Sequence, residues 1–224
     1  MRFNIKVTEE LKEVAPEFVG AAIYTRVKNS KYSEGLWIEI NEFCKYIKDN
    51  YTTADIKLIE PIQATREVYK KCKKDPNRYR PAAEALRRRI IRGLSLYQID
   101  TLVDMVNLVS LESGLSMGGF DASYIKGDTL TLGIGKENEK FEGIGRGILN
   151  IEGLPVYRDA IGGIGTPTSD EERTKLRVDT EEFLALLNGY SGATALEKAV
   201  KQLKELLVKY ADADLNDIQV IYYQ

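Results

Sequence analysis

Residues 80–121 read RPAAEALRRRIIRGLSLYQIDTLVDMVNLVSLESGLSMGGFD and contain two amphipathic segments around which the rest of the chain is organised. Apolar residues recur at helical spacing in residues 82–91 and again in residues 102–111. Pro81 suits the first turn of a helix, and Gly93 and Gly114 suit helix ends. The stretch therefore predicts a central pair of helices. The second carries polar residues, Asn107 and Ser110 among them, that are poor helix formers and so indicate another role.

The flanking sequence predicts a mixture of strands and helices. Residues 2–7 and 18–27 are typical of strands, Thr8 of a helix cap, and residues 33–49 and 61–74 of helices. From Gly118 to Gly165 glycines recur among short alternating runs, which indicates a β-rich part with tight turns. Residues 183–187 fit either type, residues 193–210 predict a helix and residues 218–223 a strand. The predicted class is α+β, with helices packed against a mixed or antiparallel sheet.

Composition narrows the range of functions. At 224 residues, with 43% hydrophobic and 29% charged residues, the chain suits one large globular domain or a domain plus an appendage. No apolar run approaches the ~20 residues of a membrane span, and the N-terminus lacks the apolar core of a signal peptide. Cys44 and Cys72 form no metal-spaced pair. We therefore expect a cytoplasmic protein with no metal, no cofactor and no membrane contact.

The sequence contains no histidine. This absence excludes a Ser-His-Asp triad, a Cys-His pair and every zinc motif that needs a histidine ligand. Any general base must therefore be a carboxylate, a lysine, a tyrosine or a group of the substrate.

Basic residues are concentrated in one part of the chain. The formal net charge is -2, yet residues 66–92 hold eleven Lys and Arg against three Asp and Glu. Such a local surface can bind phosphate although the total charge is near zero, and a solvated helix face explains the pattern about equally well. The candidate RNA-binding residues are Lys70, Lys71, Lys73, Lys74, Arg78, Arg80, Arg87 and Arg88.

The run 99–121, with its Leu102-Val103-Asp104, Asn107-Leu108-Val109 and Phe120-Asp121 elements, resembles the B3/B4 tRNA-binding and editing domain of the phenylalanyl-tRNA synthetase β subunit. Arg80-Pro81 and Glu172-Arg173-Thr174-Lys175 resemble free-standing members of that family. The resemblance covers residues 80–189. It implies one domain over residues 1–224, with 1–79 before this core and 190–224 after it, and a strand at residues 183–187.

The resemblance also implies where a binding site would lie. Asn107 matches an Asn that lines the family's pocket, and Gly118-Gly119 stands where the synthetase commonly has a His and the residue after it. The Glu that recognises the tyrosine hydroxyl falls near Leu186. Both departures oppose tyrosine editing and imply a smaller, more apolar pocket with extra room at Gly118.

Two further segments complete the candidate substrate-binding set. The loop 162–166 matches a glycine-rich pocket loop, in which backbone N–H groups could hold an anion or a carbonyl oxygen, although a tight turn between strands is the more common use of this pattern. Arg173 and Thr174 belong to the Glu-Arg-Thr-Lys run, whose acidic start at Asp170 is typical of a helix N-terminus or an exposed turn. The predicted residues are Asn107, Ser110, Gly118, Gly119, Gly163, Gly165, Thr166, Arg173 and Thr174.

Three functions are compatible with this resemblance. The first is an aminoacyl-tRNA deacylase that acts in trans on mischarged tRNA, in which positioning of the activated ester supplies much of the rate. The second is a module that binds tRNA or an amino-acid-like ligand without chemistry, and the third is an inert structural relative. No ATP-binding or synthetase core is present, so aminoacylation by this chain is not expected. The sequence does not decide whether the chain is catalytic, and it identifies no catalytic residue.

Overall fold

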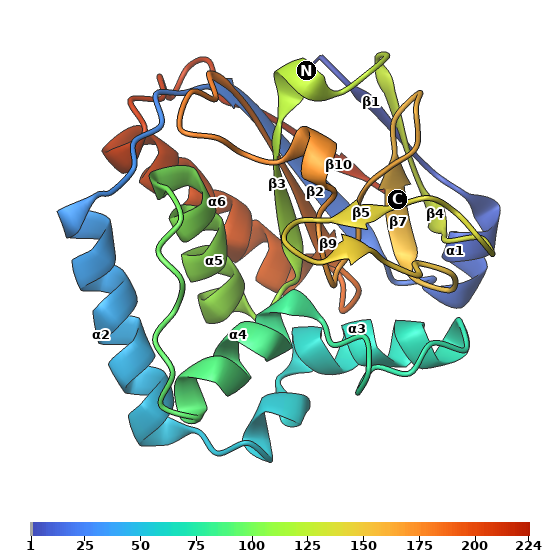
Figure 1. The fold of residues 1–224 in the computed structure, drawn as a ribbon, viewed down its shortest axis with the longest axis horizontal. Helices are drawn as coiled ribbons and strands as arrows, with labels where there is room; N and C mark the ends of the chain where they lie inside the picture. Colours follow the sequence, from blue (N-terminus) through green and yellow to red (C-terminus); the bar gives the residue numbers. More distant parts are fainter. Residues whose placement is uncertain (1) are drawn as a thin grey trace.

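A four-stranded antiparallel sheet lies between a layer of helices and a second sheet in the computed structural model, which describes residues 2–224 (Figure 1). The central sheet has the order β10-β2-β9-β3 and consists of β2 (Val19–Arg26), β3 (Met117–Asp121), β9 (Glu182–Gly189) and β10 (Gln219–Tyr223). The second sheet has the order β1-β4-β7-β8 and consists of β1 (Asn4–Val7), β4 (Thr129–Ile134), β7 (Pro155–Arg158) and β8 (Gly163–Gly165). Its β1–β4 pair is parallel and its other pairs are antiparallel. The predicted α+β class with mixed and antiparallel pairing is confirmed.

The α-helices lie in the segments in which the sequence predicts helices, and several short elements connect them. The α-helices are α1 (Glu9–Val14), α2 (Glu34–Asn50), α3 (Glu60–Lys71), α4 (Ala82–Ile91), α5 (Thr101–Ser113) and α6 (Ala193–Tyr210). Three 3₁₀ turns, η1 (Asp55–Leu58), η2 (Ala122–Tyr124) and η3 (Glu172–Thr174), and a small hairpin of β5 (Glu142–Gly143) and β6 (Gly147–Ile148) complete the chain. Helix α3 ends three residues earlier than predicted, since Lys73 takes a left-handed conformation with φ of 60°.

Strand β9 is central in its sheet and is buried on both faces. Phe183, Ala185 and Leu187 pack toward the helices, whereas Leu184 and Leu186 pack toward the second sheet. A strand with two buried faces reads as a continuous apolar run. This burial explains why residues 183–187 show no alternation in the sequence, and the strand that the family resemblance implied is confirmed.

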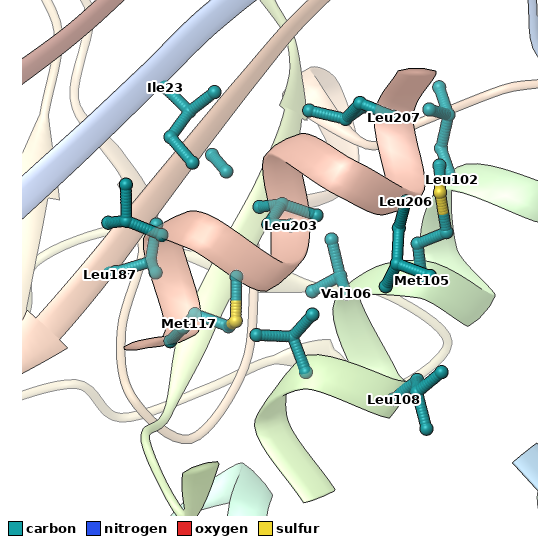
Figure 2. Packing of buried hydrophobic residues seen from close by; sticks show 14 of the residues in the cluster. Ile23, Leu102, Met105, Val106, Leu108, Met117, Leu187, Leu203, Leu206 and Leu207 are labelled. Carbon is teal, nitrogen blue, oxygen red and sulfur yellow. The ribbon is translucent and has the colours of Figure 1, made fainter. Parts of the chain in front are cut away.

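The helical core is built by α5 and α6 against the central sheet. Figure 2 shows Leu203 and Leu206 of α6 beside Met105 and Val106 of α5, with Leu187 of β9 nearby. Asp100 caps α5 by accepting a hydrogen bond from the Val103 N–H at 3.0 Å. Gly114 ends it with φ of 75°, a conformation that glycine adopts without steric cost.

A buried ion cluster joins α3 to α4 and uses several of the basic residues. Glu84 is completely buried, and its carboxylate lies 2.7 Å from both Arg66 Nη1 and Arg88 Nε. Charges buried in this way need partners, because an unpaired buried ion is very costly. Arg66 therefore joins α3 to α4, and Arg88 pairs with the same carboxylate within α4.

Residues 2–224 include no helix that has both the length and the apolar character needed to cross a bilayer.

Candidate functional site

The glycines of β3 and β8 meet around one aromatic ring and one carboxyl group. An added Cβ at Gly118 would lie 2.5 Å from Phe120 Cζ and 2.8 Å from Asp170 Oδ1, and one at Gly165 would lie 2.6 Å and 2.8 Å from the same atoms. The two predicted glycine segments are thus brought together. We call Gly118, Phe120, Gly165 and Asp170 the glycine cluster. The extra room expected at Gly118 is absent, because the Phe120 ring and the Asp170 carboxyl occupy that space.

Leu186 is the direct neighbour of this cluster. It pairs with Gly118 across the β3–β9 ladder and is completely buried in the core between the two sheets. The two positions at which this sequence departs from the synthetase pattern therefore lie side by side. Gly118 and Leu186 supply no polar side chain for a tyrosine hydroxyl, but the Asp170 carboxyl lies beside Gly118.

Asp170 is the titratable member of the glycine cluster. The residue as a whole is half-buried, but its Oδ1 atom lies against the two glycines and the Phe120 ring. Burial raises the pKa of Asp170 to about 8, and a hydrogen bond from the Gly119 N–H offsets this only in part. A carboxyl group with a pKa near neutrality can hold or accept a proton at physiological pH. Of the two interpretations of this acidic start, the exposed turn is wrong for Asp170, whereas a helix N-terminus agrees with the 3₁₀ turn Glu172–Thr174, which Glu171 caps.

Gly119 connects the cluster to helix α5. A Cβ at this position would lie 3.0 Å from Val106 Cγ2 and 2.9 Å from Leu176 Cδ1, so strand and helix approach closely here. Val106, one residue before Asn107, makes this contact. Successive helical residues are about 100° apart, so Asn107 faces another direction. The predicted placement of Asn107 in the same pocket as the glycines is thus not supported. Asn107 itself is half-buried on α5.

Ser110 has a structural role. Its hydroxyl is buried and donates to the Leu115 carbonyl at 2.8 Å, which closes the C-terminal turn of α5. The predicted substrate-binding role of Ser110 has no support from this geometry.

Residues 159–162 form the hairpin turn between β7 and β8, and residues 163–165 of the predicted loop are strand β8 itself. Asp159 Oδ1 accepts hydrogen bonds from the N–H groups of Ile161 and Gly162, at 2.9 and 3.1 Å. These N–H groups are therefore not free for a ligand, and the turn interpretation is favoured over the anion-binding one. Gly163 is required for packing, since a Cβ there would lie 2.9 Å from Phe141 Cδ2. Thr166 is buried and accepts from the Ser169 N–H at 3.0 Å.

Arg173 and Thr174 stabilise the same region. Arg173 pairs with Asp159 through both guanidinium branches, at 2.9 and 3.1 Å, and donates to the Tyr124 carbonyl at 2.9 Å. Burial by itself would raise the pKa of Asp159, but the hydrogen bonds from Arg173 and three backbone N–H groups lower it overall. Thr174 is completely buried, and its hydroxyl has no hydrogen-bond partner among residues 2–224. Neither residue contacts the glycine cluster through a hydrogen bond.

Three of the predicted RNA-binding residues are buried in the structure. Lys74 donates to the Asn150 and Glu152 carbonyls, Arg88 pairs with Glu84, and Arg87 donates to the Leu111 carbonyl and lies over the Tyr51 ring. Their placement on an RNA-binding surface is corrected here, because each guanidinium or ammonium group is engaged inside the protein.

The other predicted RNA-binding residues remain accessible. Lys70 pairs with Glu67 on the surface, Lys71 donates to the Val14 carbonyl, and Lys73 is exposed. Surface pairs of this kind are weak and do not prevent a contact with phosphate. Arg78 is exposed and Arg80 half-buried, and both line a cavity described below.

Two site residues were not found by reading the sequence. The sequence around Asp170 does not predict that its carboxyl group is buried, because the two glycines that enclose it are forty-seven residues apart in the chain. Arg146, which lines the same cavity as Arg78 and Arg80, lies in the turn Gly143–Gly147. The only pattern in the sequence that could have indicated a role for it is a single cation among glycines.

The fold and the glycine cluster define an α+β domain with a candidate site between the edge strands β3 and β8 of its two sheets. The sequence model of the B3/4 domain family matches residues 64–211, about two thirds of the chain, and the chain belongs to this family. This match extends at both ends beyond residues 80–189, the range over which the sequence resemblance was recognised.

One solved structure similar to this chain is an N-terminal fragment of the phenylalanyl-tRNA synthetase β subunit from Pyrococcus horikoshii. The sequence identity is 15% and the TM-score 0.50, and the similarity covers 98% of this chain and 50% of that fragment. This chain thus spans about half the length of the fragment, and at this identity the likeness shows the fold alone. No curated protein matches the sequence.

Proposed function

We propose that this protein binds aminoacyl-tRNA and hydrolyses the ester of a mischarged tRNA in trans. The observation that supports hydrolysis is Asp170, whose carboxyl group lies between Gly118 and Gly165 with a pKa near neutrality. Membership of the B3/4 family supports tRNA as the partner. Since aminoacyl-tRNA is used in the cytoplasm, the proposal includes a cytoplasmic location.

In the proposed reaction Asp170 acts as the general base. Its carboxylate accepts a proton from a water molecule while the water oxygen attacks the carbonyl carbon of the ester. The bond between that carbon and the ribose oxygen then breaks, the ribose oxygen takes the proton that Asp170 had accepted, and a free amino acid leaves while the Asp170 carboxylate is restored. A chain without histidine needs another group that titrates near pH 7, and a desolvated carboxyl group meets this need. For an aminoacyl group to enter, the Phe120 ring must move away from Gly118.

The test is a panel of mischarged tRNAs incubated with the pure protein and scored for loss of the ester. We expect at least one ester to be cleaved, and Asp170→Asn to remove the activity. Asp179→Asn is the matched control, because Asp179 is exposed and accepts no hydrogen bond within residues 2–224. If every ester survives, the hydrolase proposal fails.

A specific observation favours a second candidate, a binding module without chemistry. The space beside Gly118 is filled in the structure, and the family pocket position of Leu186 carries no polar group. This candidate predicts tRNA binding by the wild-type protein with no ester loss from any tRNA of the panel.

A further inference from the structure

A cavity lies beside the turn 166–169, which directly precedes Asp170. It has a volume of about 270 Å³ and is enclosed by the segment between α3 and α4, the β5–β6 hairpin and the turn 166–169. Ser169 lines this cavity, whereas the next residue, Asp170, belongs to the glycine cluster. A volume just below the usual range for ligand pockets, ~300–1,000 Å³, suits a small group and not a whole nucleotide.

The cavity is lined by arginines and by no acidic side chain. Arg78, Arg80 and Arg146 contribute to its wall, and within residues 2–224 no Asp or Glu does. Neither Arg78 nor Arg146 has a side-chain hydrogen bond or ion pair with any described residue. Burial is the main cause of the lowered pKa of nearby Lys74; the charge of Glu152 opposes this shift, and the charge of Arg78 adds to it. These observations give the cavity an uncompensated positive charge.

Arg80 is held in place while part of its guanidinium stays free. Its Nη2 donates to the Asn77 carbonyl at 3.1 Å, but its buried Nε has no hydrogen-bond partner and lies 3.6 Å from Glu84 Oε1. Glu84 is already paired with two buried arginines at 2.7 Å each. The carboxylate nearest to Arg80 is therefore shared among three cations and cannot neutralise all of them.

Neutral donors complete the wall. The Asn150 side chain lies in the cavity, and its Oδ1 accepts from the Glu152 N–H, which leaves its amide NH₂ as a donor. Thr168 is fixed by hydrogen bonds to the Tyr69 hydroxyl at 2.8 Å and the Tyr79 carbonyl at 3.3 Å. Asn150 and Thr168 thus line the same cavity as the three arginines.

We propose that this cavity binds a phosphate group, with Arg78, Arg80 and Arg146 as its cationic ligands. A phosphate carries up to about two negative charges and several acceptor oxygens, and the guanidinium fork matches its geometry in two-point contacts. The phosphate can belong to RNA or to a small phosphorylated molecule. This assignment does not depend on ester hydrolysis, since no residue of the reaction is one of these ligands.

The test measures binding of inorganic phosphate by calorimetry to the full chain and to two variants. The double variant Arg78→Gln/Arg146→Gln removes two cations, while Arg92→Gln changes the same charge at an exposed site outside the cavity. We expect saturable binding to the wild type and to Arg92→Gln, and affinity at least about tenfold weaker in the double variant, as for two charge-assisted hydrogen bonds removed. Circular dichroism confirms that each variant is folded.

Two competition arms identify the source of the phosphate. If a short single-stranded RNA without terminal phosphate displaces inorganic phosphate, the ligand is a backbone phosphodiester. If only a nucleoside monophosphate displaces it, the ligand is a phosphomonoester. Absence of saturable binding, or equal binding by the double variant and Arg92→Gln, overturns the site. Because no aminoacyl-tRNA is used, this result is independent of the ester-cleavage test.

Discussion

Asp170 is the residue whose environment departs furthest from what its place in the sequence indicates. Its carboxyl group titrates near pH 8 in the folded protein because it is desolvated, whereas an unfolded Asp titrates near ~3.9. Between these two values the folded state binds more protons than the unfolded state. The contribution of Asp170 to stability is therefore fully present below pH ~4 and is lost as pH rises through about 8.

The first prediction follows from this loss of stability with rising pH. The free energy of unfolding of the wild type should fall from about pH 5 to about pH 8.5 relative to Asp170→Asn, by roughly 1–3 kcal/mol after solvent screening. Urea denaturation of both proteins at the two pH values measures the difference. Parallel pH profiles for the two proteins would show that Asp170 is ionised in the folded state at neutral pH.

The second prediction concerns Glu84. Glu84→Gln removes the charge that two buried arginines share, and should cost about 3–5 kcal/mol of stability. Glu67→Gln is the matched control, since Glu67 pairs with Lys70 on the surface and should cost at most ~1 kcal/mol. Thermal unfolding compares the two variants. A Glu84→Gln protein as stable as the control would mean that the buried arginines find other partners.

Strands β3 and β8 come close enough to enclose side chains only because they carry glycine. The third prediction is that Gly118→Ala and Gly165→Ala destabilise the fold by roughly 1–3 kcal/mol, because each new methyl group collides with the Phe120 ring and the Asp170 carboxyl. Gly162→Ala provides the control, since nothing lies within 4 Å of its added Cβ. Equal stability of all three variants would refute the tight packing of the glycine cluster.

Element types could be read from the sequence where one face of an element is buried. The helices α5 and α6 have clear apolar stripes, and Thr8, Ser33 and Asp100 act as helix caps through hydroxyl or carboxylate oxygens. Strand β9 could not be read from periodicity alone, because both of its faces are buried. These local patterns were sufficient to predict the fold class. They were not sufficient to predict which distant strands pair with one another.

The candidate site was predictable only in part, because the local sequence does not show which polar residues are buried. The glycine segments were found because glycine and the family resemblance mark them, and the structure brings Gly118 and Gly165 together. The basic window was read as a surface, yet Arg87 and Arg88 point inward on the buried face of α4. Charge counts along the chain do not distinguish an exposed arginine from one paired with a buried carboxylate such as Glu84.

At the scale of the whole molecule, the exposed lysines near the end of α3 offer a surface for RNA. The fourth prediction is that replacing Lys70, Lys71 and Lys73 by Ala weakens tRNA binding and lowers its log–log salt slope by roughly 0.7–0.9 for each phosphate that the variant no longer neutralises. The matched control replaces Lys198, Lys201 and Lys204 of α6. Filter binding at several salt concentrations measures both. An unchanged slope in the first variant would identify these lysines as a solvated helix face.

The molecule as a whole has an exposed lysine surface, an arginine-lined cavity and the glycine cluster, and the cavity and the cluster meet at the consecutive residues Ser169 and Asp170. Neighbouring sites of this kind suit a ligand that carries both phosphate and an acyl ester, as an aminoacyl-tRNA does. The central claim is that Asp170 is the base for cleavage of that ester.

The most direct test is the pH dependence of single-turnover ester loss from the mischarged tRNA that the wild type cleaves. The rate should rise with pH to a plateau with an inflection near 8, the pKa of Asp170, and Asp170→Asn should lose this dependence together with most of the rate while tRNA affinity stays nearly unchanged. Asp170→Asn that cleaves the ester as fast as the wild type, with the same pH profile, would contradict the assignment of Asp170 as the base.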